Sequence, residues 1–397
     1  MIKAHLKWKP LLVSMITGIL SVPADALPLD SGIAHHPLRY KPLTSHLVPS
    51  GLSPQKVSIA YGFNTVAAKG KGQVIAVVAA FDDPSIEADL AVFNRQFNLP
   101  SCTTTNACFT KVYANGKKPR ADADWSGEIA LDIEWAHAMA PEAKIILVEA
   151  ATNKLADLYS AVRVAVKNGA TVVSMSWYSD ELAQQTELNV IFNNPKVTFV
   201  AASGDDGAAT NYPASSPYVL GVGGSTLTLD FYGNYQGETA WSGSGGGLST
   251  IESRPAYQRD LPTPQSKNKR GVPDVAYNAD PATGFSIYSS VETPMGKGWQ
   301  VVGGTSAGTP QWAALVALAN SALKIRVGGK FNALLYAMAA PKQGNLNFYF
   351  NNISAGTNGN CGYFCSAHQG YDYITGLGSP QVANLIEGLH GLCMRAE

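Results

Sequence analysis

A serine that follows two glycines and precedes a helical pattern is the first feature of this 397-residue chain that could do chemistry. Residues 303–310 read Gly-Gly-Thr-Ser-Ala-Gly-Thr-Pro and lead into the apolar run 311–320. Such a turn would place Ser306 at the positive N-terminal end of a helix, where a nucleophile and a developing anion are both stabilised. The simpler interpretation is that Thr305 or Ser306 only caps the helix. The motif alone does not decide between them.

Two carboxylic acids on one helical segment are the second candidate group. Residues 125–141 predict a helix on which Glu128 and Asp132 stand four residues apart and share a face. Like charges at this spacing cost a helix roughly a few tenths of a kcal/mol, so the pair has no stabilising reason of its own. Two close carboxyls share protons, so one can stay ionised as a base while the other orients it. The alternative is an ordinary solvated helix face.

A third carboxyl follows the apolar segment 197–201, in the sequence Ser-Gly-Asp-Asp-Gly at 203–207. Ligands and catalytic groups gather at the carboxyl ends of strands in parallel sheets. Asp206 directly precedes Gly207 and is interpreted as a turn residue. Asp205 is therefore the candidate functional acid.

The elements that must position these residues alternate between strand and helix. Short apolar segments predict strands at 74–81, 144–148, 171–175 and 197–201, and helical patterns cover 53–61, 84–97, 155–167 and 181–192. Continuous apolar strands separated by helices predict an α/β fold with a mainly parallel central sheet flanked by helices. After Gly204 the sequence is rich in Gly, Ser and Pro and is interpreted as loops up to the serine motif. With no clear linker, residues 51–397 are expected to form a single large domain.

The N-terminus has the pattern of a secretory signal. Lys3, Lys7 and Lys9 precede the apolar stretch 11–22, and an Ala-Asp-Ala sequence ends at Ala26. This stretch is shorter than the roughly 20 residues that span a bilayer, which disfavours an uncleaved anchor. We predict a signal peptide at 1–26, no stable membrane span, and a secreted or periplasmic protein. Residues 27–50 show no sustained periodicity and are interpreted as a short arm.

Charge and cysteine content restrict the partners. The chain has 29 basic and 29 acidic residues and no long basic stretch with interleaved aromatics, so nucleic acid is not an expected partner. Five cysteines suit an exported protein with local bridges. Cys102 with Cys108 and Cys361 with Cys365 would each close a short loop, leaving Cys393 over. Zinc is the competing interpretation, but neither pair has the Cys-x-x-Cys spacing.

Together these residues resemble the sedolisin family of serine-carboxyl peptidases, which share the subtilisin fold. Gly304-Thr305-Ser306 looks like the nucleophile motif, Glu128 and Asp132 match the Glu-x-x-x-Asp helix, and Asp205 matches the oxyanion-aspartate loop. Further segments in family order are residues 212–217, 222–224, 244–247, 272–275 and 375–380. The resemblance extends from about Leu52 to the last helix.

The resemblance implies acyl transfer from protein or peptide substrates. Ser306 would attack the peptide carbonyl, Glu128 would take and return its proton, and Asp132 would hold Glu128 in place. To stabilise the oxyanion beside the backbone N–H of Ser306, Asp205 must be protonated, because only then can a carboxyl donate a hydrogen bond. Since Glu128 must be ionised while Asp205 is neutral, we expect a bell-shaped activity profile at acidic pH.

The resemblance also implies one calcium ion near the C-terminus. The matching ligands are the side chains of Asn352 and Asp372 and the backbone carbonyls of Ile353, His368 and Gly370. Asn352 stands where the family has an aspartate, and the missing charge should weaken calcium binding. The short cysteine loop between the two halves, if bridged, could hold them together without metal.

Two alternative functions are open at this point. A histidine-based subtilisin-type triad needs an aspartate at the end of the first strand, but that strand ends in Ala79-Ala80-Phe81, and His137 lies off the Glu128 face as a packed residue. A secreted binding protein without catalysis is suggested by the short arm, which replaces the long pro-region usual in the family. Self-inhibition by a folded prodomain is then not expected. Near-neutral pH would instead keep the enzyme inactive, because Asp205 is then ionised. The presence of all four candidate residues favours an active peptidase.

Overall fold

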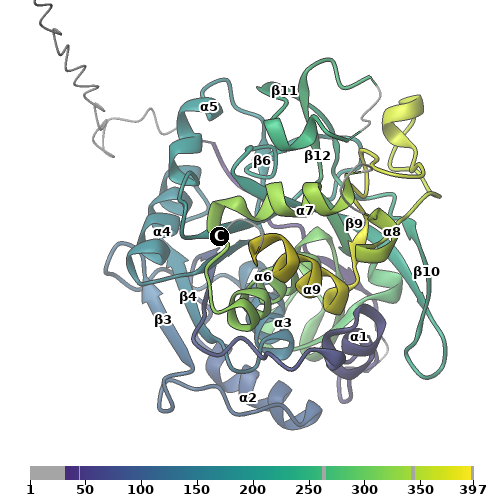
Figure 1. Ribbon diagram of the computed structural model, residues 1–397. Helices are drawn as coiled ribbons and strands as arrows, with labels where there is room; N and C mark the ends of the chain where they lie inside the picture. The colour runs from purple at the N-terminus through teal and green to yellow at the C-terminus, as the bar shows by residue number, and fades with distance from the viewer. Residues whose placement is uncertain (1–31, 44, 262–264, 341–344, 395–397) are drawn as a thin grey trace, which may run out of the picture.

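The computed structural model describes residues 32–43, 45–261, 265–340 and 345–394 (Figure 1). The predicted signal peptide at 1–26 lies outside these ranges and stays a prediction. Within them, no helix combines the length and apolar character that crossing a bilayer requires.

A central sheet of eight strands forms the core of the described chain, with bounds β2 Val74–Ala80, β3 Phe109–Tyr113, β4 Lys144–Ala150, β5 Val172–Met175, β7 Thr198–Ala202, β9 Val219–Leu229, β10 Tyr235–Ala240 and β13 Val275–Asn278. Its order is β10-β9-β7-β5-β2-β4-β3, with β13 also paired to β9. Every pair is parallel except β10 with β9. Residues 75–78 of β2 have no exposed surface, as expected of an apolar strand covered on both faces. The predicted α/β class with a mainly parallel sheet is confirmed.

Helices cover both faces of this sheet, with bounds α1 Pro54–Tyr61, α2 Ile86–Phe97, α3 Ala123–Met139, α4 Leu155–Lys167, α5 Gln185–Leu188, α6 Thr305–Leu323, α7 Phe331–Ala339, α8 Leu346–Tyr349 and α9 Val382–Met394. Helix α6 packs along α3 and over β5 and β7, near the centre of the view in Figure 1. Helix α4 packs on β2 and β4 from the other face. The two helices that carry candidate residues, α3 and α6, therefore lie in contact beneath one face of the sheet.

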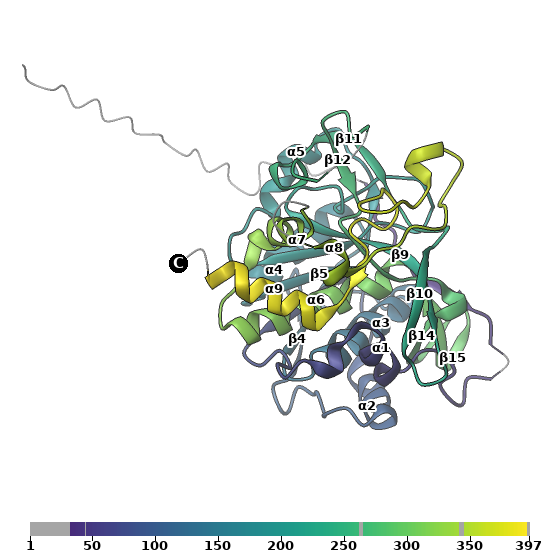
Figure 2. The same ribbon diagram turned by 45° about the vertical axis from the view of Figure 1, so that its right-hand side comes forward.

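A second, three-stranded sheet stands beside the main one, formed by β1 Arg39–Lys41, β15 Gly296–Gly303 and β14 Phe285–Thr293. The β14–β15 hairpin lies at one side of the molecule in Figure 2. Short two-stranded pairs complete the description: β6 Ser179–Asp180 with β8 Asn211–Tyr212, β11 Gly247–Ser253 with β12 Lys269–Val272, and β16 Phe350–Asn351 with β17 Ser379–Pro380. Because β15 ends at Gly303, this second sheet leads directly into the serine turn.

Two secondary-structure predictions were wrong. The helix expected at 181–192 is only α5 followed by one 3-10 turn at Asn189–Ile191, since asparagines that compete for backbone hydrogen bonds cluster there before Pro195. The Gly-rich region after Gly204 contains β9, β10, β14 and β15 rather than loops alone. Glycine serves close packing there: a Cβ on Gly223 would lie 2.5 Å from Cγ of Pro273.

Candidate active site

Ser306 is the second residue of α6 and is fully buried. The turn before it depends on Gly304, whose φ of 103° is a left-handed conformation that favours glycine. Gly304 itself offers no capping side chain, and the first N–H of α6, that of Thr305, donates to Asp205 Oδ1 at 2.8 Å. The structure thus places the hydroxyl of Ser306 at a helix N-terminus, as the sequence predicts.

Glu128 and Asp132 lie on the buried α3 helix, which begins where the Asp122 side chain accepts a hydrogen bond from the backbone N–H of Trp125. Both carboxyls have no exposed surface, so the solvated-face interpretation is wrong. Asp132 Oδ1 accepts a hydrogen bond from the Ser176 hydroxyl at 2.6 Å. Neither carboxylate oxygen of Glu128 accepts a hydrogen bond of good geometry among the described residues, but the Ser306 hydroxyl lies near enough to oppose the rise in pKa that burial causes in this carboxyl.

Ser176 was missed in the sequence analysis. It follows β5 directly, at the carboxyl end of a parallel strand, and that position is the signal that could have singled it out. Its hydroxyl lies 2.6 Å from Asp132 and 3.5 Å from the backbone carbonyl of Ser306. Ser176 therefore links the carboxyl pair of α3 to the serine turn of α6.

Asp205 lies in the turn that follows β7 and is held against the serine turn by Thr305. Its Oδ1 accepts two hydrogen bonds, from the backbone N–H of Thr305 at 2.8 Å and from the Thr305 hydroxyl at 2.9 Å. Its Oδ2 faces the guanidinium of Arg39, with 3.4 Å to Nε. The four predicted residues thus converge from α3, α6 and the β7 turn.

Burial raises the pKa of each of the three acids. Burial raises the pKa values of Glu128 and Asp132 well above their usual range. The Ser306 hydroxyl opposes the shift of Glu128, while the charge of Asp205 adds to it and the charge of Glu128 adds to that of Asp132. Burial raises the pKa of Asp205 to about 7, although its hydrogen bonds from Thr305 and the charge of Arg39 oppose the shift. The site therefore holds protons at pH values where exposed carboxyls have lost them.

The N-terminal arm lies across these side chains, which corrects the expectation of an arm without regular structure. The carbonyl oxygen of Pro37 accepts a hydrogen bond from Ser306 Oγ at 3.1 Å. On one side of this contact, His35 and Tyr178 exchange backbone hydrogen bonds of 2.8 and 2.9 Å. On the other side, β1 pairs antiparallel with β15, with Arg39 opposite Gly303. Sequence periodicity cannot detect a three-residue strand such as β1, because the strand is defined by its hydrogen bonds to β15 and not by a repeating pattern of its own.

Basic side chains of the arm contact the acids of the site. His36 Nδ1 lies 3.6 Å from Glu128 Oε2, and burial lowers the pKa of His36 although the charges of Asp124 and Asp122 oppose this. The Arg39 guanidinium contacts Asp205 and lies 3.1 Å from Oδ1 of Asp206. Asp206 is more than a turn residue, because its Oδ2 also accepts a hydrogen bond from the Tyr178 hydroxyl at 2.6 Å.

Gly304 leaves the space that the Pro37 carbonyl oxygen fills. A Cβ on Gly304 would lie 1.6 Å from that oxygen and 2.6 Å from Asp205 Oδ2. The carbonyl oxygen of the arm and Oδ2 of Asp205, which also faces Arg39, therefore both lie beside the start of α6. Both oxygens thus lie next to the turn that leads into Ser306.

The described residues contain no histidine-based triad. His137 is fully buried and bonds through Nε2 to the Pro100 carbonyl at 2.9 Å, so it is the packed residue that its spacing predicts. After the first strand of the main sheet, Asp82 pairs with Lys111 at 3.0 Å and Lys118 at 3.3 Å. The hydroxyl of Ser306 bonds to the arm and not to an imidazole.

The two predicted disulfides are confirmed. Cys102 bonds to Cys108 and Cys361 bonds to Cys365. Cys102 and Cys108 lie near His137, but a disulfide has no thiolate that could bind zinc. The zinc interpretation is therefore excluded for these four cysteines.

The side chains at the expected calcium position do not fit a calcium ion. The amide nitrogen of Asn352 donates to the Gly370 carbonyl at 2.7 Å, while its oxygen accepts from the Gly370 N–H at 3.0 Å. If the Asn352 amide were turned over, its oxygen would face the Gly370 carbonyl and its NH2 group would face the Gly370 N–H, which is unfavourable at both atoms. The NH2 group of Asn352 therefore points at a carbonyl that a calcium ion would have to contact. Asp372 accepts from the backbone N–H groups of Ile374 and Thr375, both at 2.8 Å. The Asn352 amide, the Gly370 carbonyl and the Asp372 carboxyl are thus already hydrogen-bonded within the protein.

Comparisons with known proteins agree with this geometry. The model of the Subtilase family matches residues 98–351. Kumamolisin of Bacillus sp. (strain MN-32) is 32% identical over 94% of this chain and 72% of its own length. Sedolisin of Pseudomonas sp. (strain 101) is 33% identical over 47% of this chain and 34% of its own. The solved structure of Pseudomonas sedolisin complexed with two molecules of pseudo-iodotyrostatin matches with a TM-score of 0.73 at 24% identity, covering 87% of this chain and 99% of that one, which shows a shared fold.

Proposed function

Because the chain belongs to the sedolisin family of serine-carboxyl peptidases, we propose that it hydrolyses proteins or peptides at acidic pH through Ser306, Glu128, Asp132 and Asp205. One observation supports this assignment above the others. Thr305 holds Oδ1 of Asp205 as a hydrogen-bond acceptor, while Oδ2 lies beside the peptide carbonyl oxygen that Ser306 contacts.

The carboxyl pair on α3 would activate the nucleophile. When a substrate displaces the arm, Ser306 no longer donates to Pro37, and its proton can pass to the nearby carboxylate of Glu128. Ser306 Oγ then attacks the peptide carbon, and Glu128 returns the proton to the leaving amine as the C–N bond breaks. Asp132, held by Ser176, would orient Glu128. Water then attacks the acyl carbon while Glu128 takes its proton, and Glu128 returns that proton to Ser306 Oγ as the ester bond breaks.

Asp205 would stabilise the oxyanion as a neutral acid. Because Oδ1 already accepts from Thr305, a proton on Asp205 resides on Oδ2, where it can be donated to the developing negative charge. The backbone N–H of Ser306 at the start of α6 supplies a second donor. Ionised Asp205 would instead repel the oxyanion, so this step requires the protonated form.

These roles give the pH dependence its sign. The pKa of Asp205 is about 7, so its donating form is lost as the pH rises through that value. Glu128 and Asp132 have raised pKa values and share protons as a pair, so activity falls at low pH when both become protonated. The expected profile is a bell with its upper limit near neutrality.

Export from the cytosol remains part of the proposal. The signal-like N-terminus motivates it, and the two disulfides suit an oxidising compartment. We also propose that residues 51–397 act as one peptidase domain, with residues 27–50 as its arm.

The test is hydrolysis of a denatured protein between pH 3 and 8 by the purified chain. Ser306→Ala and Glu128→Gln should each lower turnover by about a thousandfold or more, while the exposed matched control Glu142→Gln should retain it. An enzyme most active above neutrality, or one that tolerates both substitutions, would contradict the assignment. A folded chain that binds peptides without cutting them would support the alternative of a binding protein.

A further inference from the structure

The arm runs through the site as an extended peptide that continues in both directions. Before the Pro37 contact, the Gly32 carbonyl accepts from the Leu155 N–H at 2.9 Å, and the Ala34 N–H donates to the Asn153 carbonyl at 2.8 Å. After the contact, residues 39–41 form β1. The peptide bond that lies at Ser306 joins Pro37 to Leu38. Residues 32–37 precede this bond and residues 38–41 follow it, and all of them lie within the described chain.

We propose that this enzyme is an endopeptidase that binds one extended chain in the frame of its own arm, between the Tyr178 segment and β15. The inference rests on the proposed function and deepens it. Strand-like backbone pairing on both sides of the nucleophile is how extended peptides are held against sheet edges. In this frame the cut falls after the residue that takes the place of Pro37.

The residues before the cut distinguish an endopeptidase from an enzyme that removes N-terminal tripeptides. An enzyme of that kind must close its cleft at the third residue before the cut and bind a free amino group there. Here the third residue is His35, whose N–H donates to the Tyr178 carbonyl and not to a carboxylate. The chain continues to Ala34, which is fully buried, and leaves at Ile33, which is 53% exposed. The fourth and fifth positions are thus built to be occupied.

The side chains after the cut indicate what the cleft accepts. Leu38 is 6% exposed and packs against Gly127, where a Cβ would lie 3.1 Å from Leu38 Cδ2, so the first position takes an apolar residue. Arg39 at the second position contacts Asp205 and Asp206, so this position favours a basic residue. Asp206 is the specificity residue, since Asp205 is assigned to the reaction itself.

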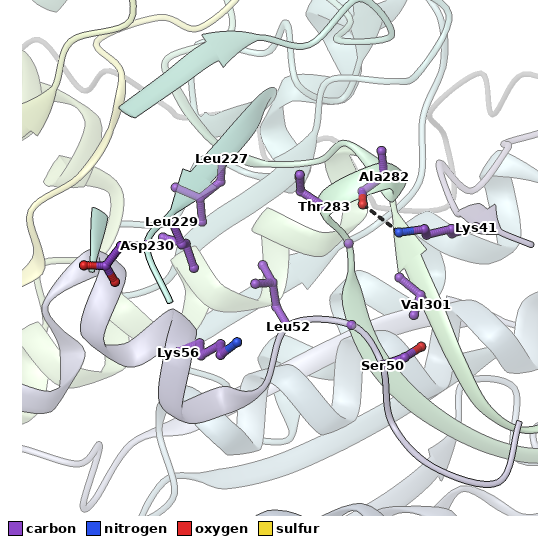
Figure 3. Close-up of a pocket in the computed structure, with 12 residues that line it drawn as sticks. Lys41, Ser50, Leu52, Lys56, Leu227, Leu229, Asp230, Ala282, Thr283 and Val301 are labelled. Carbon is purple, nitrogen blue, oxygen red and sulfur yellow. Dashed lines mark hydrogen bonds between the residues drawn. The ribbon is translucent and has the colours of Figure 1, made fainter. Parts of the chain in front are cut away.

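The path after the cut is also open. Lys41, at the fourth position, extends toward the Ala282 carbonyl and donates to it at 3.0 Å (Figure 3). Beyond it lies a pocket with the apolar side chains of Leu52, Leu227 and Leu229 on its wall. A substrate that extends past the position of Lys41 therefore lies near a further apolar surface.

In this arrangement the arm occupies the nucleophile, because the Ser306 hydroxyl donates its hydrogen bond to the Pro37 carbonyl. Ser306 Oγ donates to the Pro37 oxygen at 3.1 Å and also lies near the Glu128 carboxyl, where it opposes the rise in pKa that burial causes. His36 lies against Glu128 on the same side. A free substrate must displace this segment before it can be cut.

The test uses two probes with the full-length chain at acidic pH. The first is an N-acetylated, C-amidated peptide copying residues 32–41 with Pro37→Ala, and the second is an unblocked tripeptide coumarin amide. We expect one cut in the blocked peptide, between its sixth and seventh residues by mass spectrometry, and a kcat/KM at least about a hundredfold above that of the tripeptide amide. Faster turnover of the unblocked tripeptide amide would overturn the proposal.

Two further outcomes separate this proposal from the function it rests on. If a denatured protein is cut in a Ser306-dependent manner but the blocked peptide is not, the frame is wrong and the peptidase assignment stands. If nothing is cut, both are wrong. Specificity is tested with a second peptide in which Gln replaces the residue equivalent to Arg39. The enzyme should prefer the original peptide roughly 3- to 10-fold, which is the effect of one partly exposed ion pair. The substitution Asp206→Asn in the enzyme should abolish this preference. A preference that survives Asp206→Asn would exclude Asp206 as its source.

Discussion

Replacing Asp205 by Asn should stabilise the protein at alkaline pH and leave its stability at acidic pH nearly unchanged. The pKa of Asp205 is raised from 3.8 to about 7, chiefly by burial, so the folded state binds this proton more tightly than the unfolded state. A raised pKa contributes stability that is fully present below the unfolded value and is lost as the pH rises through the folded value. The shift of about three units corresponds to about 4 kcal/mol, which the wild type loses between about pH 4 and pH 8.

An asparagine has nearly the shape of the neutral acid and never ionises, so the variant avoids that loss. The assay is urea unfolding at pH 4, 6 and 8 in a Ser306→Ala background, which prevents self-digestion. We expect Asp205→Asn to unfold at nearly the same urea concentration as its parent at pH 4, and to be more stable by up to about 4 kcal/mol at pH 8. Asp206→Asn, with a side chain that is 59% exposed, is the matched control and should show no such dependence. Equal effects of Asp205→Asn at pH 4 and pH 8 would refute the reasoning.

Three further predictions concern the arm, the support of the carboxyl pair and the C-terminal loop. Arg39→Ala should lower KM for a free peptide by roughly 3- to 10-fold with kcat unchanged, because the tethered arm competes less strongly, whereas Lys41→Ala should have little effect; equal KM values would show that the arm does not compete. Ser176→Ala should lower kcat about tenfold and move the acidic limb of the pH profile upward, because Asp132 loses a hydrogen bond that lowers its pKa, and Ser176→Thr should restore both. A chelator should leave the wild-type Tm and activity unchanged, and a calcium-dependent Tm in the wild type would contradict the metal-free arrangement around Asn352.

The sequence alone allowed accurate prediction of the elements with strong local signals. The helix of Glu128 and Asp132 was expected at 125–141 and lies at Ala123–Met139. The four strands expected from continuous apolar runs, β2, β4, β5 and β7, lie within about two residues of their predicted bounds, whereas β3, β9 and β13, which also pair in parallel, were not expected. The convergence of Ser306 with the three acids followed from the family resemblance and not from periodicity.

What the sequence could not show depends on contacts between distant segments. Ser176 is an ordinary strand-end serine until α3 brings Asp132 to it. The arm has no periodicity because its three-residue strand is defined by β15, which lies about 260 residues further along the chain. The strands after Gly204 contain Val and Ile, such as Val222 and Ile287, but glycines interrupt their apolar pattern where neighbouring backbones approach closely.

The complete burial of α3 ties the chemistry of this enzyme to its evolution. Every residue from Trp125 to Met139 is buried, so the two acids lie in the structural core instead of on a replaceable loop. Most substitutions in this helix would reduce the amount of folded enzyme in the cell as well as its rate, and a screen that scores activity alone would confuse the two. Isosteric changes such as Glu128→Gln separate them. Natural variation in substrate range should accordingly accumulate in the segments that line the cleft and spare this helix.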